Sequence, residues 1–488
     1  MRSDIVVIGA GITGSTIARQ LSKYRQKILV VEKRSDVAFG SPTKGNTGLI
    51  HAGYDDPPGT RKAKLCVRGN MLWHSIAKEL SAPLKETGSL VVAFNKDEED
   101  HLRQLKKRGE KNGVPLLEIV EDRNRLLKIE PHLNKDATAA LFAPTAAITA
   151  PYELALAVAE NATQNGVKFL FETEVTDIIA RNGEIKGIKT SRGRVEADCV
   201  INAAGLESDE VSAMAGLGHF TIHPRKGEYY LFDKKLSDLV RHILFPVPTP
   251  ISKGIVVTST PEGNVLIGPN ALDVEDKDDL NTTATGLSEV FNGALKLVPG
   301  LAQYRNRIIT YFSSLRPETG TGDFIIRNYD EPKGFVNVAG IRSPGLTAAP
   351  AIAEMVVDLI KESGMDLAEK ELFISNREPI NHAIREFDLS RAERLISEDS
   401  NYGHVICRCE HISEAEIVEA VRRGATTLDG VKFRTRASMG RCQGGFCTSH
   451  IIRILAKELG IPPTEVTKKG GASRLLLCEA KKLLVGED

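Results

Sequence analysis

Apolar and polar residues alternate along this chain in two different patterns. Residues 4–14 predict a buried strand, a glycine turn and the start of a helix, and residues 27–32 predict a second apolar strand. A strand, a helix and a strand in this order form a β-α-β unit with parallel strands. The alternation returns over residues 150–205 and again from residue 335, where residues 346–360 predict a further helix.

The second pattern consists of shorter apolar runs that turns interrupt. It covers residues 226–245 and 254–267 and predicts an antiparallel sheet. We therefore expect an α/β fold, in which a Rossmann-like domain is assembled from separated segments and an antiparallel-sheet substrate domain is inserted between them. The expected boundaries are residues 1–85, 146–215 and 331–365 for the Rossmann-like domain, 86–145 and 216–330 for the sheet domain, 366–401 for a linker, and 402–488 for a small helical domain with four cysteines.

Short sequence signals predict where the C-terminal helices begin and end. Two capping boxes, Ser390 with Glu393 and Ser413 with Glu416, predict two helix starts. A last helix is expected to begin just after Cys447 and to stop before Gly460.

Composition limits the classes of protein that the chain can belong to. Its 488 residues exceed what one hydrophobic core usually supports, so two or three domains are expected. Lysine plus arginine equals aspartate plus glutamate, 64 against 64, which argues against a nucleic acid or a membrane surface as partner. No signal peptide and no membrane-spanning run is evident, and seven scattered cysteines do not resemble a secreted disulfide framework. We expect a cytoplasmic protein.

The first turn carries a dinucleotide-binding fingerprint. Gly9, Gly11 and Gly14 follow the first strand, and Glu32 ends the second strand 18 positions later. The glycines permit a tight turn, close approach of a pyrophosphate and close helix packing, and the helix N-terminus supplies partial positive charge. Glu32 is expected to bind the ribose of an adenosine half, and Lys33 beside it is assigned to the cofactor as well.

Two later segments favour a flavin over a nicotinamide. Residues 198–205 predict a buried strand that ends in the small residues Ala204 and Gly205, which lets the backbone pass close to a cofactor. Residues 337–349 predict a strand, a glycine loop and a helix start. The dipole of that helix could face negative charge on the N1–C2=O edge of a flavin, and its cofactor-binding candidates are Gly340, Gly345, Leu346 and Thr347.

Four cysteines form two tight pairs near the C-terminus. Cys407 and Cys409 are spaced Cys-x-Cys, and Cys442 and Cys447 are spaced Cys-x4-Cys. Four thiolates can hold structural zinc or an iron–sulfur cluster. The spacing is atypical of zinc ribbons and favours an iron–sulfur cluster, with zinc and unligated redox thiols as the alternatives. Four arginines supply positive charge in this segment: Arg408, Arg434, Arg436 and Arg441. This charge is expected to raise the reduction potential of the cluster and to bind a partner protein.

These motifs resemble a known family. Residues 1–365 are similar to the FAD-dependent oxidoreductases that include D-amino-acid oxidase, flavin-linked glycerol-3-phosphate dehydrogenase and L-2-hydroxyglutarate oxidase. The cysteine segment is similar to the BFD-like [2Fe-2S] domain, which the family appends to the large subunit of anaerobic glycerol-3-phosphate dehydrogenase. The resemblance implies FAD and a [2Fe-2S] cluster, and it assigns further cofactor contacts to Asn46, Thr47, Gly48 and Val175.

The resemblance also implies the catalytic candidates. His51 lies in the loop that faces the flavin in the family, which makes it the candidate for the base or for a group that orients substrate; a packed loop histidine is the alternative. Arg316 matches the arginine that faces substrate, with an ion pair to Glu318 or Asp323 as the alternative. Arg342 occupies a position where the glycerol-3-phosphate enzymes carry a lysine. Further cations and tyrosines in the predicted sheet are Arg225, Lys253, Tyr229 and Tyr230, each more typical of a solvated face.

The resemblance leaves the substrate open between two classes. The cysteine domain argues for sn-glycerol 3-phosphate, whereas the loop around His51 and the run that ends at Cys66 are nearer the hydroxyglutarate oxidases. We expect oxidation of glycerol 3-phosphate to dihydroxyacetone phosphate, with hydride transfer from C2 to flavin N5. Electrons would pass through the cluster to an acceptor subunit, which is either a second flavoprotein or an iron–sulfur protein. Any association with a membrane would be peripheral and would occur through that subunit. The alternatives are a 2-hydroxy-acid oxidase or dehydrogenase and a non-catalytic electron-transfer subunit.

Overall fold

The computed structural model describes residues 1–40, 42–249, 253–382 and 384–481. The chain forms two compact units, residues 1–33 with 40–377, and residues 34–39 with 378–488. The second unit thus includes a short segment from near the beginning of the chain. None of the helices in the described ranges is long and apolar enough to cross a membrane.

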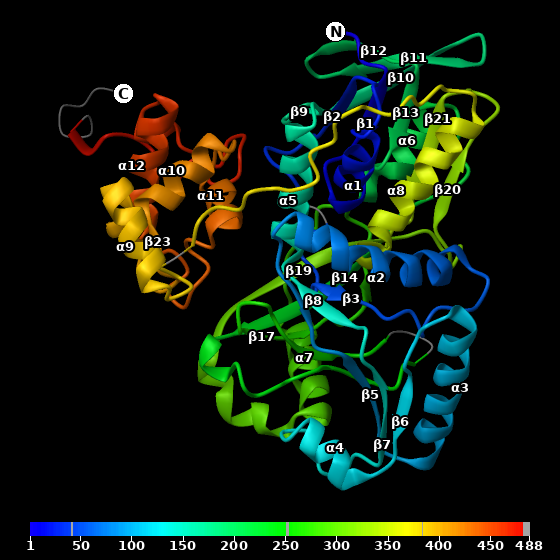
Figure 1. Cartoon of the computed structure of the whole chain (residues 1–488), viewed down its shortest axis with the longest axis vertical. Helices are drawn as coiled ribbons and strands as arrows, with labels where there is room; N and C mark the ends of the chain where they lie inside the picture. The colour runs from blue at the N-terminus through cyan, green and yellow to red at the C-terminus, as the bar shows by residue number, and fades with distance from the viewer. Residues whose placement is uncertain (41, 250–252, 383, 482–488) are drawn as a thin grey trace. The chain divides into compact units, whose positions relative to one another are not determined.

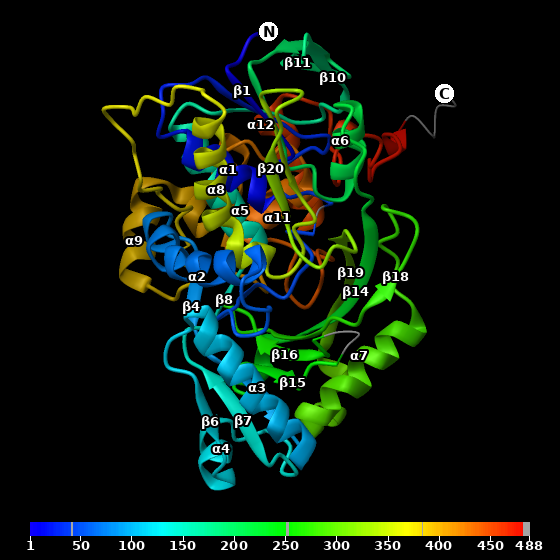
Figure 2. The same cartoon turned by 90° about the vertical axis from the view of Figure 1, so that its right-hand side faces the viewer.

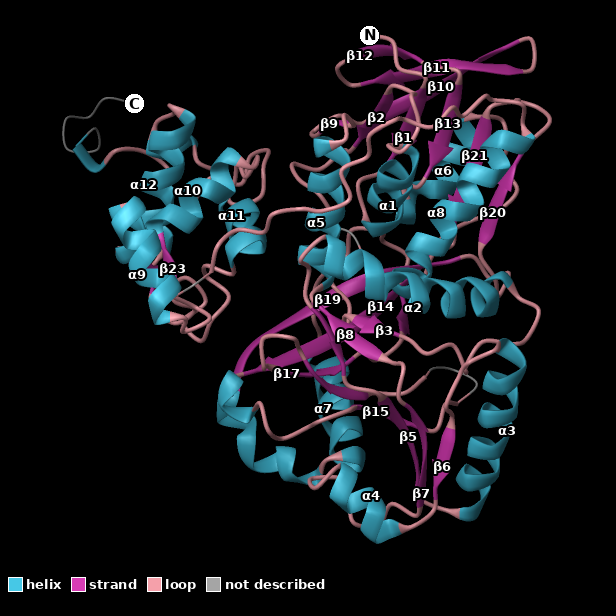
Figure 3. Ribbon diagram, viewed as in Figure 1, coloured by secondary structure: helices cyan, strands magenta, loops and turns pink. Residues whose placement is uncertain are grey.

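The first unit contains a mainly parallel sheet (Figure 3). Its described strands run in the order β20-β21-β13-β1-β2-β9. Neighbours pair in parallel, except that β20 runs antiparallel to β21. This arrangement confirms the predicted β-α-β unit. The strands are β1 (Ile5–Ile8), β2 (Ile28–Val31), β9 (Lys168–Leu170), β13 (Cys199–Asn202), β20 (Ile325–Asn328) and β21 (Phe335–Ala339).

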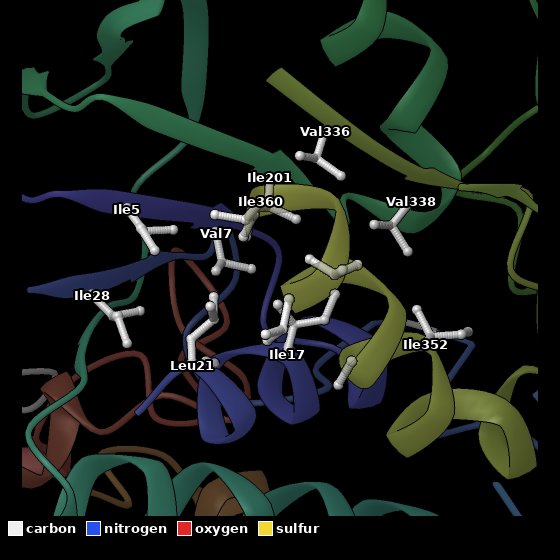
Figure 4. Packing of buried hydrophobic residues seen from close by; sticks show 14 of the residues in the cluster. Ile5, Val7, Ile17, Leu21, Ile28, Ile201, Val336, Val338, Ile352 and Ile360 are labelled. Atoms are coloured by element: carbon white, nitrogen blue, oxygen red, sulfur yellow. The ribbon is translucent and has the colours of Figure 1, made fainter. Parts of the chain in front are cut away.

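Helices α1 (Ile12–Leu21) and α8 (Gly345–Glu362) cover one face of this sheet (Figure 4). Ile17 of α1 and Ile352 of α8 are fully buried against strand residues such as Val7. Each such aliphatic side chain contributes roughly 1.5–3 kcal/mol when it leaves water. Helix α5 (Pro151–Gln164) packs beside α1. The predicted helix over residues 346–360 is confirmed as α8.

The opposite face of the parallel sheet packs on a small antiparallel sheet and on helix α6 (Ser208–Met214). The small sheet contains β10 (Val175–Arg181), β11 (Glu184–Thr190) and β12 (Gly193–Glu196). Both faces of the parallel strands are therefore buried, which explains why these strands are continuous apolar runs in the sequence.

A second, larger sheet lies in the same unit, and helices α3 (Lys96–Asn112) and α7 (Ala284–Leu297) flank it (Figure 2). The order of its described strands is β18-β14-β17-β16-β15-β5-β7-β6, with β19 added on β14. Pairing is antiparallel as predicted, apart from β15, which runs parallel to β5. The strands are β5 (Ser89–Ala93), β6 (Glu118–Val120), β7 (Ala139–Ala143), β14 (His223–Phe232), β15 (Ile243–Pro246), β16 (Val256–Ser259), β17 (Val265–Gly268), β18 (Leu272–Asp273) and β19 (Ile308–Glu318).

The second unit is mostly helical (Figure 1). It contains α9 (Leu389–Glu398), β22 (Val405–Cys407), β23 (Ile412–Ser413), α10 (Glu414–Arg422), α11 (Leu428–Thr435) and α12 (Thr448–Leu459). The capping box at Ser413 and Glu416 is confirmed, as is the helix between Cys447 and Gly460. The capping box at Ser390 and Glu393 is wrong, because Asp388 caps α9 by accepting a hydrogen bond from the Arg391 amide at 3.0 Å.

Candidate cofactor, substrate and cluster sites

The glycine turn between β1 and α1 has the geometry of a dinucleotide site. Gly9 has a φ of +101°, and a Cβ there would lie 2.5 Å from the carbonyl oxygen of Ala203. A Cβ on Gly14 would lie 2.0 Å from the Gly9 carbonyl oxygen, so a larger residue would push α1 off the turn. Gly11 is the N-cap of α1 and supplies no capping side chain. The first turn of α1 is therefore suited to an anionic pyrophosphate.

The acidic residue after β2 is held against this turn. One Glu32 carboxylate oxygen accepts a hydrogen bond from the Ala10 amide at 2.8 Å. Lys33 forms an ion pair with Glu207 at 2.6 Å, and both side chains are about one-third exposed or less. Glu32 is thus fixed at the edge of the glycine turn, where the ribose of a dinucleotide is expected.

The loop after the second strand is organised by its own side chains. Asn46 donates to the carbonyls of Pro42 and Thr43 and accepts from the Gly48 amide at 2.7 Å. Gly48 has a φ of +70° and leaves no room for a Cβ beside the Thr149 carbonyl. Thr47 lies between them and is half-buried. These bonds hold residues 42–48 without any contribution from a cofactor.

Four other assigned positions lie at strand ends or beginnings. Val175 is buried at the start of β10. Ala204 and Gly205 follow β13, and Gly205 has a φ of +62°. Gly340 follows β21 with a φ of +66°, where a Cβ would lie 2.5 Å from Thr319. The backbone can pass close to a ligand at these points, and their assignment to the cofactor stays a prediction.

Helix α8 begins with an N-terminus to which no side chain is bonded as a cap. Helix α2 (Arg61–Glu79) fixes this N-terminus: Trp73 donates its indole hydrogen to the carbonyl oxygen of Leu346 at 2.9 Å. A Cβ on Gly69 would lie 2.1 Å from the carbonyl oxygen of Thr347, so the two helices are in backbone contact. Gly345 is the first residue of α8. Because α8 is eighteen residues long, its helix dipole places partial positive charge at this N-terminus.

His51 is held from both sides of its backbone. It follows β3 (Leu49–Ile50), which pairs with β8 (Ala147–Thr149), and β8 also pairs with β4 (Leu84–Glu86). The His51 amide donates to the Thr347 hydroxyl at 2.9 Å, and its carbonyl accepts from Asn70 at 3.1 Å. The imidazole Nε2 lies 3.4 Å from the Ser343 hydroxyl. His51 is thus tied to the start of α8.

Charged residues surround this histidine. Lys253 forms an ion pair with Asp55 at 2.5 Å. Burial and the positive charge of Lys253 lower the pKa of His51 to about 3. Burial alone would lower the pKa of Lys253, but the carboxylates of Asp55 and Asp56 outweigh it and raise that pKa. His51 is therefore a neutral imidazole at physiological pH, able to accept a proton.

Arg316 of β19 does not form the ion pair that was its alternative interpretation. Within the described residues, its guanidinium donates to backbone carbonyls, at 2.9 Å to Lys226, 2.7 Å to Asn270 and 3.3 Å to Arg225. Burial lowers the pKa of Arg316, although not enough to remove its charge. Glu318 is near enough to oppose this shift, but no carboxylate of the described residues makes an ion pair with Arg316, so a bound anion would be stabilised beside it.

The other predicted cations are paired. Arg342 forms an ion pair with Glu318 at 2.5 Å. Arg225 makes a bidentate pair with Asp273, at 2.6 and 3.1 Å.

Lys62 is a buried cation that the sequence did not indicate. It is 3% exposed and donates a hydrogen bond to the Gly322 carbonyl at 2.8 Å. Burial, and then the charge of Arg342, lower the pKa of Lys62 to about 8.

The two tyrosines named beside these cations take packing positions. Tyr229 stacks on Phe312 with ring centroids 4.8 Å apart. Tyr230 packs edge-on against Phe291 and Tyr311. Both rings belong to the larger sheet, and nothing in these contacts gives them a chemical role.

The four cysteines converge in the second unit. The sulfur atoms of Cys407 and Cys409 are 3.9 Å apart, and those of Cys409 and Cys442 are 3.6 Å apart. Two thiolates on one tetrahedral metal, each at about 2.3 Å, would lie about 3.8 Å apart. Cys447 is the N-cap of α12. A Cβ on Gly440 would lie 2.4 Å from the Cys409 sulfur, so this glycine makes room for the ligand set.

Two of the four arginines near the cysteines are not available for docking. Arg434 and Arg436 are 5% and 6% exposed, and they are paired with Asp36 and Glu410. The expectation that these two arginines dock a partner is wrong, because buried carboxylates already neutralise their charges. Arg408 and Arg441 are exposed.

Comparison with known proteins agrees with both units. Residues 4–359 match the FAD dependent oxidoreductase family, and residues 405–457 match the BFD-like [2Fe-2S] binding domain. The chain is 43% identical to a glycerol 3-phosphate dehydrogenase of Caloramator mitchellensis, over 97% of this chain and 98% of the relative. It is 28% identical to the anaerobic glycerol-3-phosphate dehydrogenase subunit A1 of Haloferax volcanii, over 93% of this chain and 83% of the relative.

A solved structure gives the same picture for the first unit. The dithionite-reduced L-alpha-glycerophosphate oxidase of Mycoplasma pneumoniae, with FAD bound, matches with a TM-score of 0.73 and 31% identity, over 77% of this chain and 98% of that one. Fold and sites together define a flavin-dependent oxidoreductase with an attached iron–sulfur module. The chain belongs to the FAD dependent oxidoreductase family, and its cofactors are FAD and a [2Fe-2S] cluster.

Proposed function

We propose that this enzyme oxidises sn-glycerol 3-phosphate to dihydroxyacetone phosphate. The observation that carries the proposal is Arg316, a half-buried guanidinium whose hydrogen bonds go to backbone carbonyls, on the sheet that borders the His51 region. An anionic group on the substrate would supply the missing negative charge and can be bound in bidentate fashion. The relatives named for glycerol 3-phosphate support a phosphate as that group.

His51 is the proton acceptor in this proposal. Its neutral imidazole would take the proton of the C2 hydroxyl while the C2 hydrogen leaves as hydride. The bonds to Thr347 and Asn70 fix the backbone of His51, so Nε2 has a defined direction before substrate arrives. Bound FAD supplies the hydride acceptor and can release the electrons one at a time.

Lys253 and its carboxylate partners shape the same site. The Asp55 side chain pairs with Lys253, and both side chains are at least two-thirds buried. This cation lowers the proton affinity of His51 before substrate binds. A phosphate placed among Arg316 and these cations would add negative charge and make His51 a stronger base at the moment it is needed.

The acceptor would dock on the surface beside the cysteines. Phe446, between the ligands Cys442 and Cys447, is 77% exposed. Arg408 and Arg441, also exposed, come from the same ligand loops. An exposed aromatic ring beside cations suits a partner subunit with an acidic face, which would receive electrons from the cluster one at a time.

An anaerobic substrate panel tests the function. Glycerol 3-phosphate should bleach the flavin absorbance of the holoenzyme within seconds, whereas L-2-hydroxyglutarate and glycerol should not. Bleaching by L-2-hydroxyglutarate alone would assign the enzyme to the 2-hydroxy acids. A flavin that no member of the panel reduces would leave an electron-transfer subunit as the better interpretation.

A further inference from the structure

Residues 34–39 form an unusual part of the second unit, because they begin three residues after β2 of the first. Asp36 makes a bidentate ion pair with Arg434 of α11; one of its two bonds, from Nη2 to Oδ1, is 2.9 Å long. The side chains are 3% and 5% exposed. Each partner therefore depends on the other, because an uncompensated charge at this depth is strongly unfavourable.

Other contacts hold the same segment in the second unit. The Ser35 hydroxyl donates to the Lys469 carbonyl at 2.7 Å. Phe39 packs edge-on against Phe433, with ring centroids 5.6 Å apart. A Cβ on Gly430 would lie 3.0 Å from the Asp36 carboxylate, so a larger residue there would press on the pair. The segment is thus held by an ion pair, a hydrogen bond and an aromatic contact.

Both flanks of the segment bind the glycine turn of the first unit. Glu32, two residues before it, accepts from the Ala10 amide at 2.8 Å. Thr43, four residues after it, accepts from the Ile12 amide at 3.0 Å through its hydroxyl. Six of the ten residues between Glu32 and Thr43, residues 34–39, belong to the iron–sulfur module.

We propose that the Asp36–Arg434 pair is a latch through which the iron–sulfur module positions the adenosine-binding edge of the FAD site. With the latch closed, Glu32 and Thr43 are tethered from both sides, and the glycine turn is ordered before FAD binds. Holding this segment in advance lowers the entropy that FAD binding must overcome. The enzyme thereby retains FAD best when the module that carries electrons away is folded. The inference rests on the FAD cofactor and not on the identity of the substrate.

Substitution of Arg434 by methionine tests the latch in the holoenzyme. FAD release, followed as the fluorescence of free FAD after dilution, should become about 5- to 150-fold faster in Arg434→Met and Asp36→Asn. The iron content and the visible absorbance of the cluster should be retained. Lys468→Met is the matched control, because the Lys468 side chain pairs with Asp429 in the same unit, at 3.0 and 3.1 Å, so its loss removes an ion pair of the module but not the latch. Wild-type FAD release in both latch variants, with the cluster retained, would overturn the proposal.

A measurement on the unmodified protein decides the matter if a latch variant loses its cluster. Binding energies that are coupled act in both directions. Removal of FAD should therefore speed amide hydrogen exchange in residues 34–39 and in α11, but not in α12. Identical exchange in α11 with and without FAD would contradict the latch.

Discussion

Replacement of His51 by asparagine should slow reduction of the flavin by glycerol 3-phosphate by about 10²- to 10⁴-fold, the usual contribution of a positioned general base. Asparagine keeps the backbone bonds to Thr347 and Asn70, so the loop should stay in place. It removes the imidazole whose pKa burial and Lys253 lower to about 3, and with it the proton acceptor. Anaerobic stopped-flow absorbance measures the rate directly.

The control for this variant is His74→Asn. His74 lies on α2 and pairs with Glu86 at 2.9 Å, outside the cluster of charges around His51. It should reduce flavin at the wild-type rate. A His51→Asn enzyme with full flavin content and a rate within threefold of wild type would show that another group accepts the proton.

Substitution of Arg316 by methionine should lower kcat/KM for glycerol 3-phosphate by roughly 30- to 5,000-fold, which corresponds to the loss of about 2–5 kcal/mol from a buried charge pair. Methionine keeps the unbranched apolar stem but cannot bind an anion. The kcat/KM of Arg316→Lys should lie between those of wild type and Arg316→Met, because an ammonium group keeps the charge without the bidentate geometry. Steady-state kinetics with an artificial electron acceptor gives kcat and KM for each variant.

Arg225→Met is the matched control for Arg316. The two arginines are directly paired in register across β14 and β19, but Arg225 is already neutralised by Asp273. Its loss should change kcat/KM by less than threefold. Equal losses in the two variants would mean that the damage comes from the sheet and not from a lost substrate contact.

Local chemistry explains why much of the first unit was predictable. Gly14 leaves no space for a Cβ beside the carbonyl of Gly9, five residues earlier, and α8 follows its strand and glycine loop within a few residues. Such features depend on neighbours in sequence, which a pattern can reveal. The cysteine pairs were likewise predictable, since the ligand spacing is local within each pair.

Pairings between distant residues were not predictable. Arg434 and Asp36 lie 398 positions apart, and no periodicity connects them. The sequence predicts Lys253 as a solvated residue, whereas in the structure it forms a largely buried ion pair with Asp55. The parallel pairing of β15 with β5 joins two separate insertions. In each case a charge or a strand edge is satisfied by a partner that only the three-dimensional fold supplies.

In the proposed function, FAD and the cluster form one electron path that receives its electrons from glycerol 3-phosphate. An anaerobic titration of the holoenzyme with glycerol 3-phosphate, followed by flavin absorbance and by electron paramagnetic resonance of the cluster, tests it most directly. We expect the flavin to bleach and the signal of a reduced [2Fe-2S] centre to appear with it, whereas the flavin of Cys409→Ser should bleach without that signal. A flavin that glycerol 3-phosphate leaves oxidised, or one that is fully reduced beside a cluster that never accepts an electron, would contradict it.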